Sequence, residues 1–203
     1  KNMQAVREKF GDDMIIMGIV KANAYGHGAV KVAKALVEYG AGMLGVAAID
    51  EAVELRENGI DAPILILGQI FRQDYATAIE NDVTCTVVDI VTAQGISQKA
   101  KELGKIAKVH IKIDTGMGRV GIWHECADSV IKEIKKLQNI KITGMFSHLS
   151  SADCDTDYTM SQLEAFKKAT SNHIEDGMLI HLHNSAGLRY IPVEPPFNAV
   201  RMG

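Results

Sequence analysis

The sequence predicts an α/β fold, a (β/α)8 TIM-type barrel in which parallel strands alternate with helices. Short apolar runs alternate with amphipathic segments along the whole chain, which is typical of a parallel sheet with helices packed outside it. Eight such runs with seven connections, in a chain of 203 residues, fit a compact barrel better than the alternative, an open doubly wound sheet. In both architectures ligands bind beyond the carboxyl ends of the strands.

The expected strands are short apolar runs with polar or glycine-containing segments between them. In chain order they are Met14–Ala22, Met43–Ala48, Pro63–Gly68, Cys85–Asp89, Val109–Thr115, Ile140–His148, Leu179–Ser185 and Phe197–Gly203. Apolar residues with helical spacing are clearest in two segments between them, 29–37 and 127–137. Helix ends are expected at Gly40, Gly59, Gly104 and Gly177. Two further segments are expected to be irregular, 151–157 and 189–196.

The bulk composition is that of a single globular domain. The chain is 47% hydrophobic and 23% charged, and its net charge of −3 gives no reason to expect nucleic acid or a membrane surface as a partner. No apolar run approaches the roughly 18 residues of a membrane span, and no signal-peptide pattern opens the chain. The three cysteines are widely spaced and form no CxxC pair, so we expect no metal site and a cytoplasmic location. Both ends are abrupt, which suggests that residues 1–203 are one domain of a longer protein.

A lysine ends the first expected strand and is followed by a glycine-containing segment. Strand alternation places Lys21 on the same side as Met17 and Ile19, toward the mouth of the barrel. A lone lysine at such a position usually extends to solvent. The alternative is a desolvated amine that acts as a Schiff-base nucleophile. Tyr25 adds a hydroxyl group, and the glycines after it allow the backbone to approach a bound anion.

The fifth expected strand ends in a G-x-G-x-x-G pattern at residues 116–121. A dinucleotide site is not indicated, because the helix begins late, near His124, and no acidic residue closes the next strand. Alternation along this strand points His110, Lys112 and Asp114 into the barrel. A cation inside a barrel needs a partner, such as that aspartate or nearby arginines, or a modification that removes its charge.

The remaining strand ends carry further polar residues. His148 ends the sixth expected strand, Asn184 and Ser185 end the seventh, and Arg201 and Gly203 lie on the eighth. Taken singly, a strand-end histidine is often only hydrogen-bonded, and an Asn-Ser pair often caps the next helix. Packing alone does not require so many polar side chains at one rim of the barrel. Together, these strand-end residues indicate an anionic, aromatic ligand that carries a carbonyl group.

Several of these segments resemble the alanine racemase family. Residues 21–28, Lys-Ala-Asn-Ala-Tyr-Gly-His-Gly, look like the family's pyridoxal-phosphate attachment motif, and residues 114–121 look like its second signature. His148, the run 183–186 and the run 197–203 follow in the family's order and spacing, so the resemblance covers nearly the whole chain. The resemblance implies that Lys21 forms a Schiff base with pyridoxal 5′-phosphate and then acts as the base on one face of the substrate.

The resemblance also implies roles for the other rim residues. Tyr25, Ser185 and the Gly203 backbone would hold the phosphate, with Asn184 beside them. Arg119 would contact the phenolic oxygen. Its neighbour Lys112 is often carbamylated in the family, which would turn a buried cation into a partner for that arginine. Arg201 would face the pyridine nitrogen with His148 behind it, and a permanently charged arginine would keep that nitrogen unprotonated.

The implied activity is the interconversion of L- and D-alanine by two bases, which supplies D-alanine for peptidoglycan. In this family the second base is a tyrosine from another domain of a partner subunit. We therefore expect a homodimer for the longer protein and poor activity for residues 1–203 alone. Two alternatives stay open: a serine racemase of the same family, and a non-catalytic single-domain pyridoxal-phosphate protein. A decarboxylase of the same barrel type should carry an acid in place of Arg201.

Overall fold

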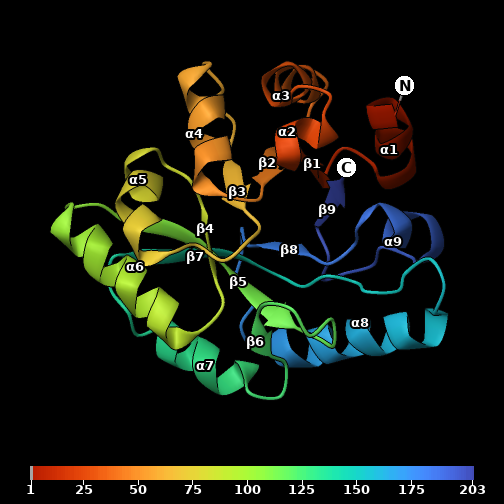
Figure 1. Cartoon of the computed structure of the whole chain (residues 1–203). Coiled ribbons are helices and arrows are strands. Elements are labelled where there is room, and N and C mark those ends of the chain that lie inside the picture. The colour runs from red at the N-terminus through yellow and green to blue at the C-terminus, as the bar shows by residue number, and fades with distance from the viewer. Residues whose placement is uncertain (1) are drawn as a thin grey trace.

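In the computed structural model, which describes residues 2–203, eight parallel strands form a closed barrel (Figure 1). The strands are β1 (Ile15–Ile19), β2 (Met43–Val46), β3 (Ile64–Ile66), β4 (Cys85–Val87), β5 (Ala107–Asp114), β7 (Ile140–Phe146), β8 (Leu179–His181) and β9 (Ala199–Met202). They form two arcs, β3-β2-β1-β9 and β4-β5-β7-β8. The Leu65–Thr84 bridge joins the arcs on one side, and Arg201 N donates to His183 O on the other. The predicted barrel is confirmed, and each expected apolar run overlaps one strand of the barrel.

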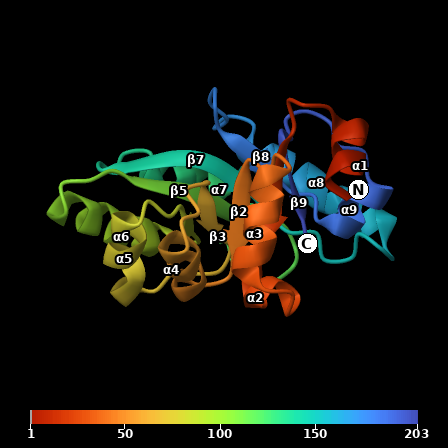
Figure 2. The same cartoon turned by 90° about the horizontal axis from the view of Figure 1, so that it is seen from above.

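Helices surround the barrel and connect its strands (Figure 2). They are α1 (Asn2–Phe10), α2 (Lys21–Tyr25), α3 (Ala29–Glu38), α4 (Ile49–Glu57), α5 (Tyr75–Glu80) after the 3₁₀ turn Arg72–Asp74, α6 (Ile90–Glu102), α7 (Ala127–Ile134), α8 (Thr156–Thr170) and α9 (Ser185–Tyr190). A short strand that the sequence did not predict, β6 (Ile122–Trp123), pairs with β5 in the loop before α7. Within residues 2–203 no helix combines the length and apolar character that a bilayer crossing requires.

The barrel has an outer and an inner packing layer, as the alternation along the strands predicts. Ile111 and Ile113 of β5 belong to the large cluster that strands and helices share. A separate small cluster inside the barrel joins four strands through Met17, Met43, Leu65 and Phe146. His110, Lys112 and Asp114 alternate with these isoleucines and are also buried, but they are polar. The inner layer therefore contains buried lysine and histidine side chains beside its apolar cluster.

Three details of the sequence prediction are wrong. The helix α8 begins at Thr156, inside the segment 151–157 that we expected to be irregular, because the Asp155 carboxylate accepts from the Tyr158 amide and caps the helix. The last residues of α9 include Arg189, in the segment expected to be irregular. Gly177 lies in a turn well after α8 has ended at Thr170, whereas Gly40, Gly59 and Gly104 take positive φ just after helices, as predicted.

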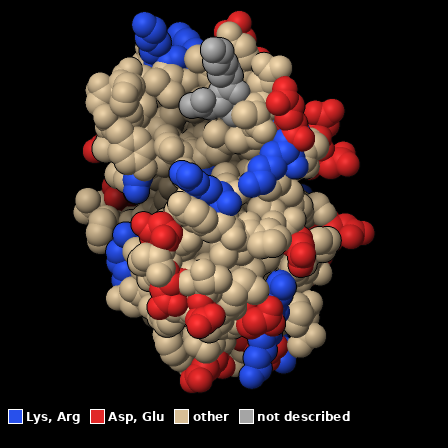
Figure 3. Space-filling model, turned by 90° about the vertical axis from the view of Figure 1, so that its right-hand side faces the viewer, with Lys and Arg blue, Asp and Glu red and all other residues tan. Residues whose placement is uncertain are grey.

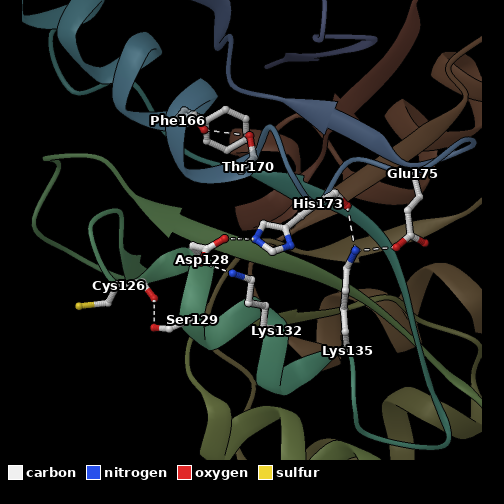
Figure 4. A network of polar contacts seen from close by, with 9 residues as sticks. All are labelled: Cys126, Asp128, Ser129, Lys132, Lys135, Phe166, Thr170, His173 and Glu175. Atoms are coloured by element: carbon white, nitrogen blue, oxygen red, sulfur yellow. Dashed lines mark hydrogen bonds and ion pairs between the residues drawn. The ribbon is translucent and has the colours of Figure 1, made fainter.

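A polar network joins α7 to the segment between α8 and β8 on the outside of the barrel (Figure 4). Buried His173 contacts the Asp128 carboxylate at 3.0 Å, and Lys135 pairs with Glu175 at 2.6 Å. Lys135 also donates to the His173 carbonyl. On the face that carries α1 and α9, basic and acidic side chains are interspersed (Figure 3). These charges support the outer helices and lie away from the inner layer.

One glycine allows a histidine to enter the inner layer. The β5–β7 register shifts at Val109 and His110, so that His110 lies opposite Gly144. A Cβ atom at Gly144 would lie 2.5 Å from the Leu179 carbonyl oxygen and 2.6 Å from the His110 ring. The close approach of backbone and imidazole therefore requires glycine at this position.

Replacing Gly144 with alanine should destabilise the fold by about 1–3 kcal/mol, because neither backbone nor ring has room to move. Urea denaturation measures this change in the free energy of unfolding. Lys141→Ala on the exposed start of the same strand is the control and should stay within about 0.5 kcal/mol of the parent. Equal stability of Gly144→Ala and the parent would show that the strand spacing is looser than described.

Candidate active site

The carboxyl ends of the strands surround a cavity of about 720 Å³. Its walls include every site residue that the sequence predicted, namely Lys21, Tyr25, Lys112, Arg119, His148, Asn184, Ser185, Arg201 and Gly203. Four of these side chains are lysine or arginine, and none of the described lining residues is Asp or Glu. The cavity is therefore built to receive an anionic ligand.

Lys21 begins α2, which is a left-handed turn that the sequence analysis did not predict. The next four residues, Ala22 to Tyr25, all have φ between 50° and 54°, the left-handed conformation. This conformation costs roughly 1–2 kcal/mol for each residue with a Cβ atom. Consecutive left-handed residues reverse the chain over a very short distance, so the amine and the Tyr25 ring face the same cavity. The Lys21 Nζ atom lies 6.0 Å from the centre of that ring.

Arg201 is the most deeply buried cation of the site, with 4% of its surface exposed. Its Nη1 donates to His181 Nδ1 at 2.7 Å and to the His181 carbonyl at 3.2 Å. Its Nη2 donates to the carbonyls of Ser147 and Leu182, both at 2.8 Å, and contacts His148 Nδ1 at 3.4 Å. Burial lowers the pKa of Arg201 to about 9, which leaves the guanidinium charged at neutral pH.

The donors of Arg201 fix the protons of a buried histidine pair that the sequence analysis did not assign to the site. Because His181 Nδ1 accepts from Arg201, its ring proton must lie on Nε2. That nitrogen is 3.1 Å from His110 Nδ1, which must then accept. Burial lowers the pKa of His110 to about 3 and that of His181 well below its usual value, so both rings are neutral. Inward alternation along β5 was the one sequence signal for His110.

His148 is likewise held neutral. Burial, followed by the charges of Arg201 and Arg119, lowers the pKa of its imidazole to about 3. Its Nδ1 atom is therefore free to accept from Arg201, as the sequence analysis expected.

Lys112 points into the cavity without a carboxylate partner. Its ammonium donates to the Leu67 carbonyl at 3.2 Å and lies 5.3 Å from the centre of the Phe146 ring. Burial, and then the charges of Arg119 and Arg201, lower the pKa of Lys112 to about 8. The alternative of an internal pair with Asp114 is not observed. That carboxylate instead accepts from three backbone amides, those of Gly116, Gly118 and Arg119.

Two hydroxyl groups and a backbone amide meet at one edge of the cavity, which we call the hydroxyl corner (Tyr25, Ser185 and Gly203). Gly203 N lies 3.3 Å from Ser185 Oγ, and a Cβ atom on Gly203 would lie 3.4 Å from the Tyr25 hydroxyl oxygen. Asn184 lies beside the corner, but its side chain caps α9 by accepting from Gly187 N and also donates to the Leu149 carbonyl. The capping role that its sequence allowed is thus confirmed.

The fold and the cavity together define a class: a (β/α)8 barrel with a lysine amine, a hydroxyl corner and a buried arginine around one anion-binding site. The family described as alanine racemase, N-terminal domain, matches residues 1–203. The chain belongs to this family, as its sequence motifs indicated.

Individual relatives agree with this assignment. Alanine racemase 2 of Caldanaerobacter subterraneus subsp. tengcongensis is 43% identical over 192 residues, which cover 92% of this chain and 50% of that protein. The structure of an alanine racemase from Clostridium difficile 630 superimposes with a TM-score of 0.93 at 40% identity, covering all of this chain and 54% of that one. An alanine racemase from Bacillus anthracis, solved with bound L-Ala-P, gives 0.88 at 35% identity, covering all of this chain and 53% of that one. This chain thus spans about half the length of the relatives that it matches.

The neutral histidines give a testable property of the site. The ring signals of His110 and His148 in NMR spectra should not titrate between pH 5.5 and 8, because imidazoles with pKa values of about 3 are uncharged throughout that range. Unfolded histidines titrate near pH 6.5 and therefore bind protons that the folded protein does not. The lowered pKa values should thus make the protein less stable as the pH falls below about 6.5. The urea-unfolded protein is the control. A midpoint between pH 6 and 7 for either ring in the folded protein would contradict this charge distribution.

Proposed function

We propose that this chain is the cofactor-binding domain of a pyridoxal-phosphate-dependent alanine racemase, an isomerase that supplies D-alanine for peptidoglycan. The observation that carries the proposal is the meeting of Lys21, the hydroxyl corner and Arg201 around one cavity. The free thiols of Cys85, Cys126 and Cys154 agree with a reducing, cytoplasmic location.

The donor set of the cavity fits this cofactor. A phosphate needs several hydrogen-bond donors, and the hydroxyl corner contains two hydroxyl groups and an amide close together. In this structure the Gly203 amide donates to Ser185 Oγ and that hydroxyl donates to the Gly203 carbonyl, so both donors would turn to a bound phosphate. A phenolic oxygen is matched by Arg119, and an aldehyde by the primary amine of Lys21. When bound, the cofactor withdraws electrons from the substrate Cα and so makes its C–H bond acidic.

The chain's own residues then divide the remaining tasks. Lys21 removes or returns the Cα proton on one face of the substrate. Arg201 would supply a fixed positive charge to the ring nitrogen of the cofactor, and His148 accepts a hydrogen bond from Arg201. Because Arg201 cannot easily give up a proton, it disfavours protonation of that nitrogen and the side reactions that protonation promotes.

Racemisation requires a second acid–base group on the opposite face, and these residues do not offer one. Tyr25 belongs to the hydroxyl corner, and the Tyr158 hydroxyl donates to the Gly116 carbonyl at 2.7 Å. We infer that the second group comes from a further domain in a partner subunit, so that the longer protein acts as a homodimer. The length of the relatives, about twice that of this chain, supports this view.

Lys21 should carry the cofactor. After incubation with pyridoxal 5′-phosphate and reduction with borohydride, peptide mapping should find the label on Lys21, and Lys21→Arg should abolish it. Lys34→Arg on the exposed face of α3 is the control and should leave labelling unchanged. A label on Lys112 would contradict the assignment of Lys21 as the lysine that carries the cofactor.

Lys112 should form a carbamate. With a pKa of about 8, about half of its amine is unprotonated at pH 8, and the fraction falls as the pH decreases. The free amine attacks CO₂, forms an N–C bond and releases a proton, which leaves an anion beside Arg119. A ¹³C NMR signal from ¹³C-bicarbonate should therefore grow from pH 6 to pH 8.5 and be absent in Lys112→Arg. A signal that survives in that variant would contradict the prediction.

Residues 1–203 alone should exchange a Cα proton yet racemise alanine poorly. Loss of one acid–base partner removes about 10²–10⁴-fold in rate, whereas Lys21 alone can still exchange deuterium on one enantiomer. Both rates are measured in parallel on the purified chain. Racemisation within tenfold of the whole encoded protein would reveal a second base among these residues.

A further inference from the structure

A carboxylate on a neighbouring helix holds the turn that follows Lys21. Glu51 lies in the first turn of α4, and its Oε1 accepts from the Ala22 amide at 2.6 Å. Its Oε2 accepts from the Ala47 amide at 2.6 Å and from the Ala48 amide at 3.4 Å. One side chain therefore joins the residue after Lys21 to the end of β2.

The turn needs such an anchor because its backbone is strained. Four consecutive left-handed residues follow Lys21, and strain of this kind persists only where the surroundings over-determine it. The Ala24 methyl group packs into the core, but the other side-chain hydrogen bonds of the turn are local. Asn23 Oδ1 accepts from Ala29 N at the start of α3, and His27 contacts the Ala24 carbonyl. Neither contact fixes the turn against the barrel.

Glu51 is chemically suited to this task. An ionised carboxylate only accepts hydrogen bonds, so it can serve three amides at once, and charge strengthens each bond. Its place at the start of α4 also puts the negative charge where the helix dipole favours it. A glutamine of the same shape would turn an NH₂ group toward at least one of the three amides.

We propose that Glu51 is a positioning residue for Lys21: it fixes the left-handed turn to the end of β2 and so holds the amine at the cavity. The inference rests on the proposed role of Lys21 and assigns Glu51 no contact with cofactor or substrate. Its loss should affect reactions of the amine far more than binding at the hydroxyl corner, because Ser185 and Gly203 lie outside the turn and Tyr25 is its last residue, three positions from the Ala22 amide that Glu51 holds.

The test compares Glu51→Gln with Asp50→Asn in the whole encoded protein. Asp50 is an exposed neighbour in the same helical turn, so its variant matches the loss of charge. Two quantities are measured on cofactor-free protein: the rate at which pyridoxal 5′-phosphate attaches to Lys21, and the affinity for pyridoxine 5′-phosphate, which has no aldehyde. Glu51→Gln should slow attachment by about 10- to 100-fold, from the loss of charge-assisted hydrogen bonds, and change the affinity by less than about threefold. Asp50→Asn should change neither.

Hydrogen exchange of the cofactor-free protein gives a second readout that is independent of the cofactor. The Ala22 amide should exchange at least about tenfold faster in Glu51→Gln, while the Gly203 amide should be unchanged. Two results would overturn the role of Glu51 and leave the proposed function intact. One is attachment at the parental rate in Glu51→Gln, and the other is an equal loss of attachment rate and of pyridoxine 5′-phosphate affinity in that variant. Failure of the parent to attach cofactor to Lys21 would instead reject the proposed function, and the role of Glu51 with it.

Discussion

A buried guanidinium without a carboxylate partner organises this structure. Arg201 lies almost entirely inside the barrel, and the hydrogen-bond acceptors around it are carbonyl groups and imidazoles, all neutral. A buried charge must be compensated by hydrogen bonds. The ends of β7 and β8 therefore present their carbonyls to this side chain, and His181 and His148 present unprotonated nitrogens. The proton positions of three histidines follow from one arginine.

The positive charge that remains uncompensated explains the rest of the cavity. Arg201 and Arg119 both lower the pKa of Lys112, because like charges oppose a further cation. In the proposed function an anion would relieve this charge, either the phosphate of the cofactor or a carbamate on Lys112. The hydroxyl corner and the strained turn after Lys21 are the neutral parts that we propose to orient such a ligand. In this proposal the cations of the cavity attract the anionic ligand, and the positions of the neutral groups determine which ligand atom lies next to the Lys21 amine.

The sequence predicted the barrel and its rim better than the interior of the site. Apolar runs located each strand, and alternation along β5 correctly turned Lys112 inward. The sequence did not predict the left-handed turn, because Ala22 to Tyr25 contain no glycine and residues with a Cβ atom favour other backbone conformations. The contact of His110 with His181 spans 71 residues, and the Glu51 contact with Ala22 spans 29. Side-chain contacts between distant segments leave no periodic signal in a sequence.

The central claim is that Arg201 sets the electronic state of the cofactor ring, and ¹⁵N NMR tests it most directly. Pyridoxal 5′-phosphate labelled at the ring nitrogen is bound to the protein, and its chemical shift is followed from pH 6 to pH 9. With a charged guanidinium beside it, the nitrogen should give the shift of an unprotonated pyridine throughout this range. A shift typical of a protonated pyridinium at pH 7 would contradict the account.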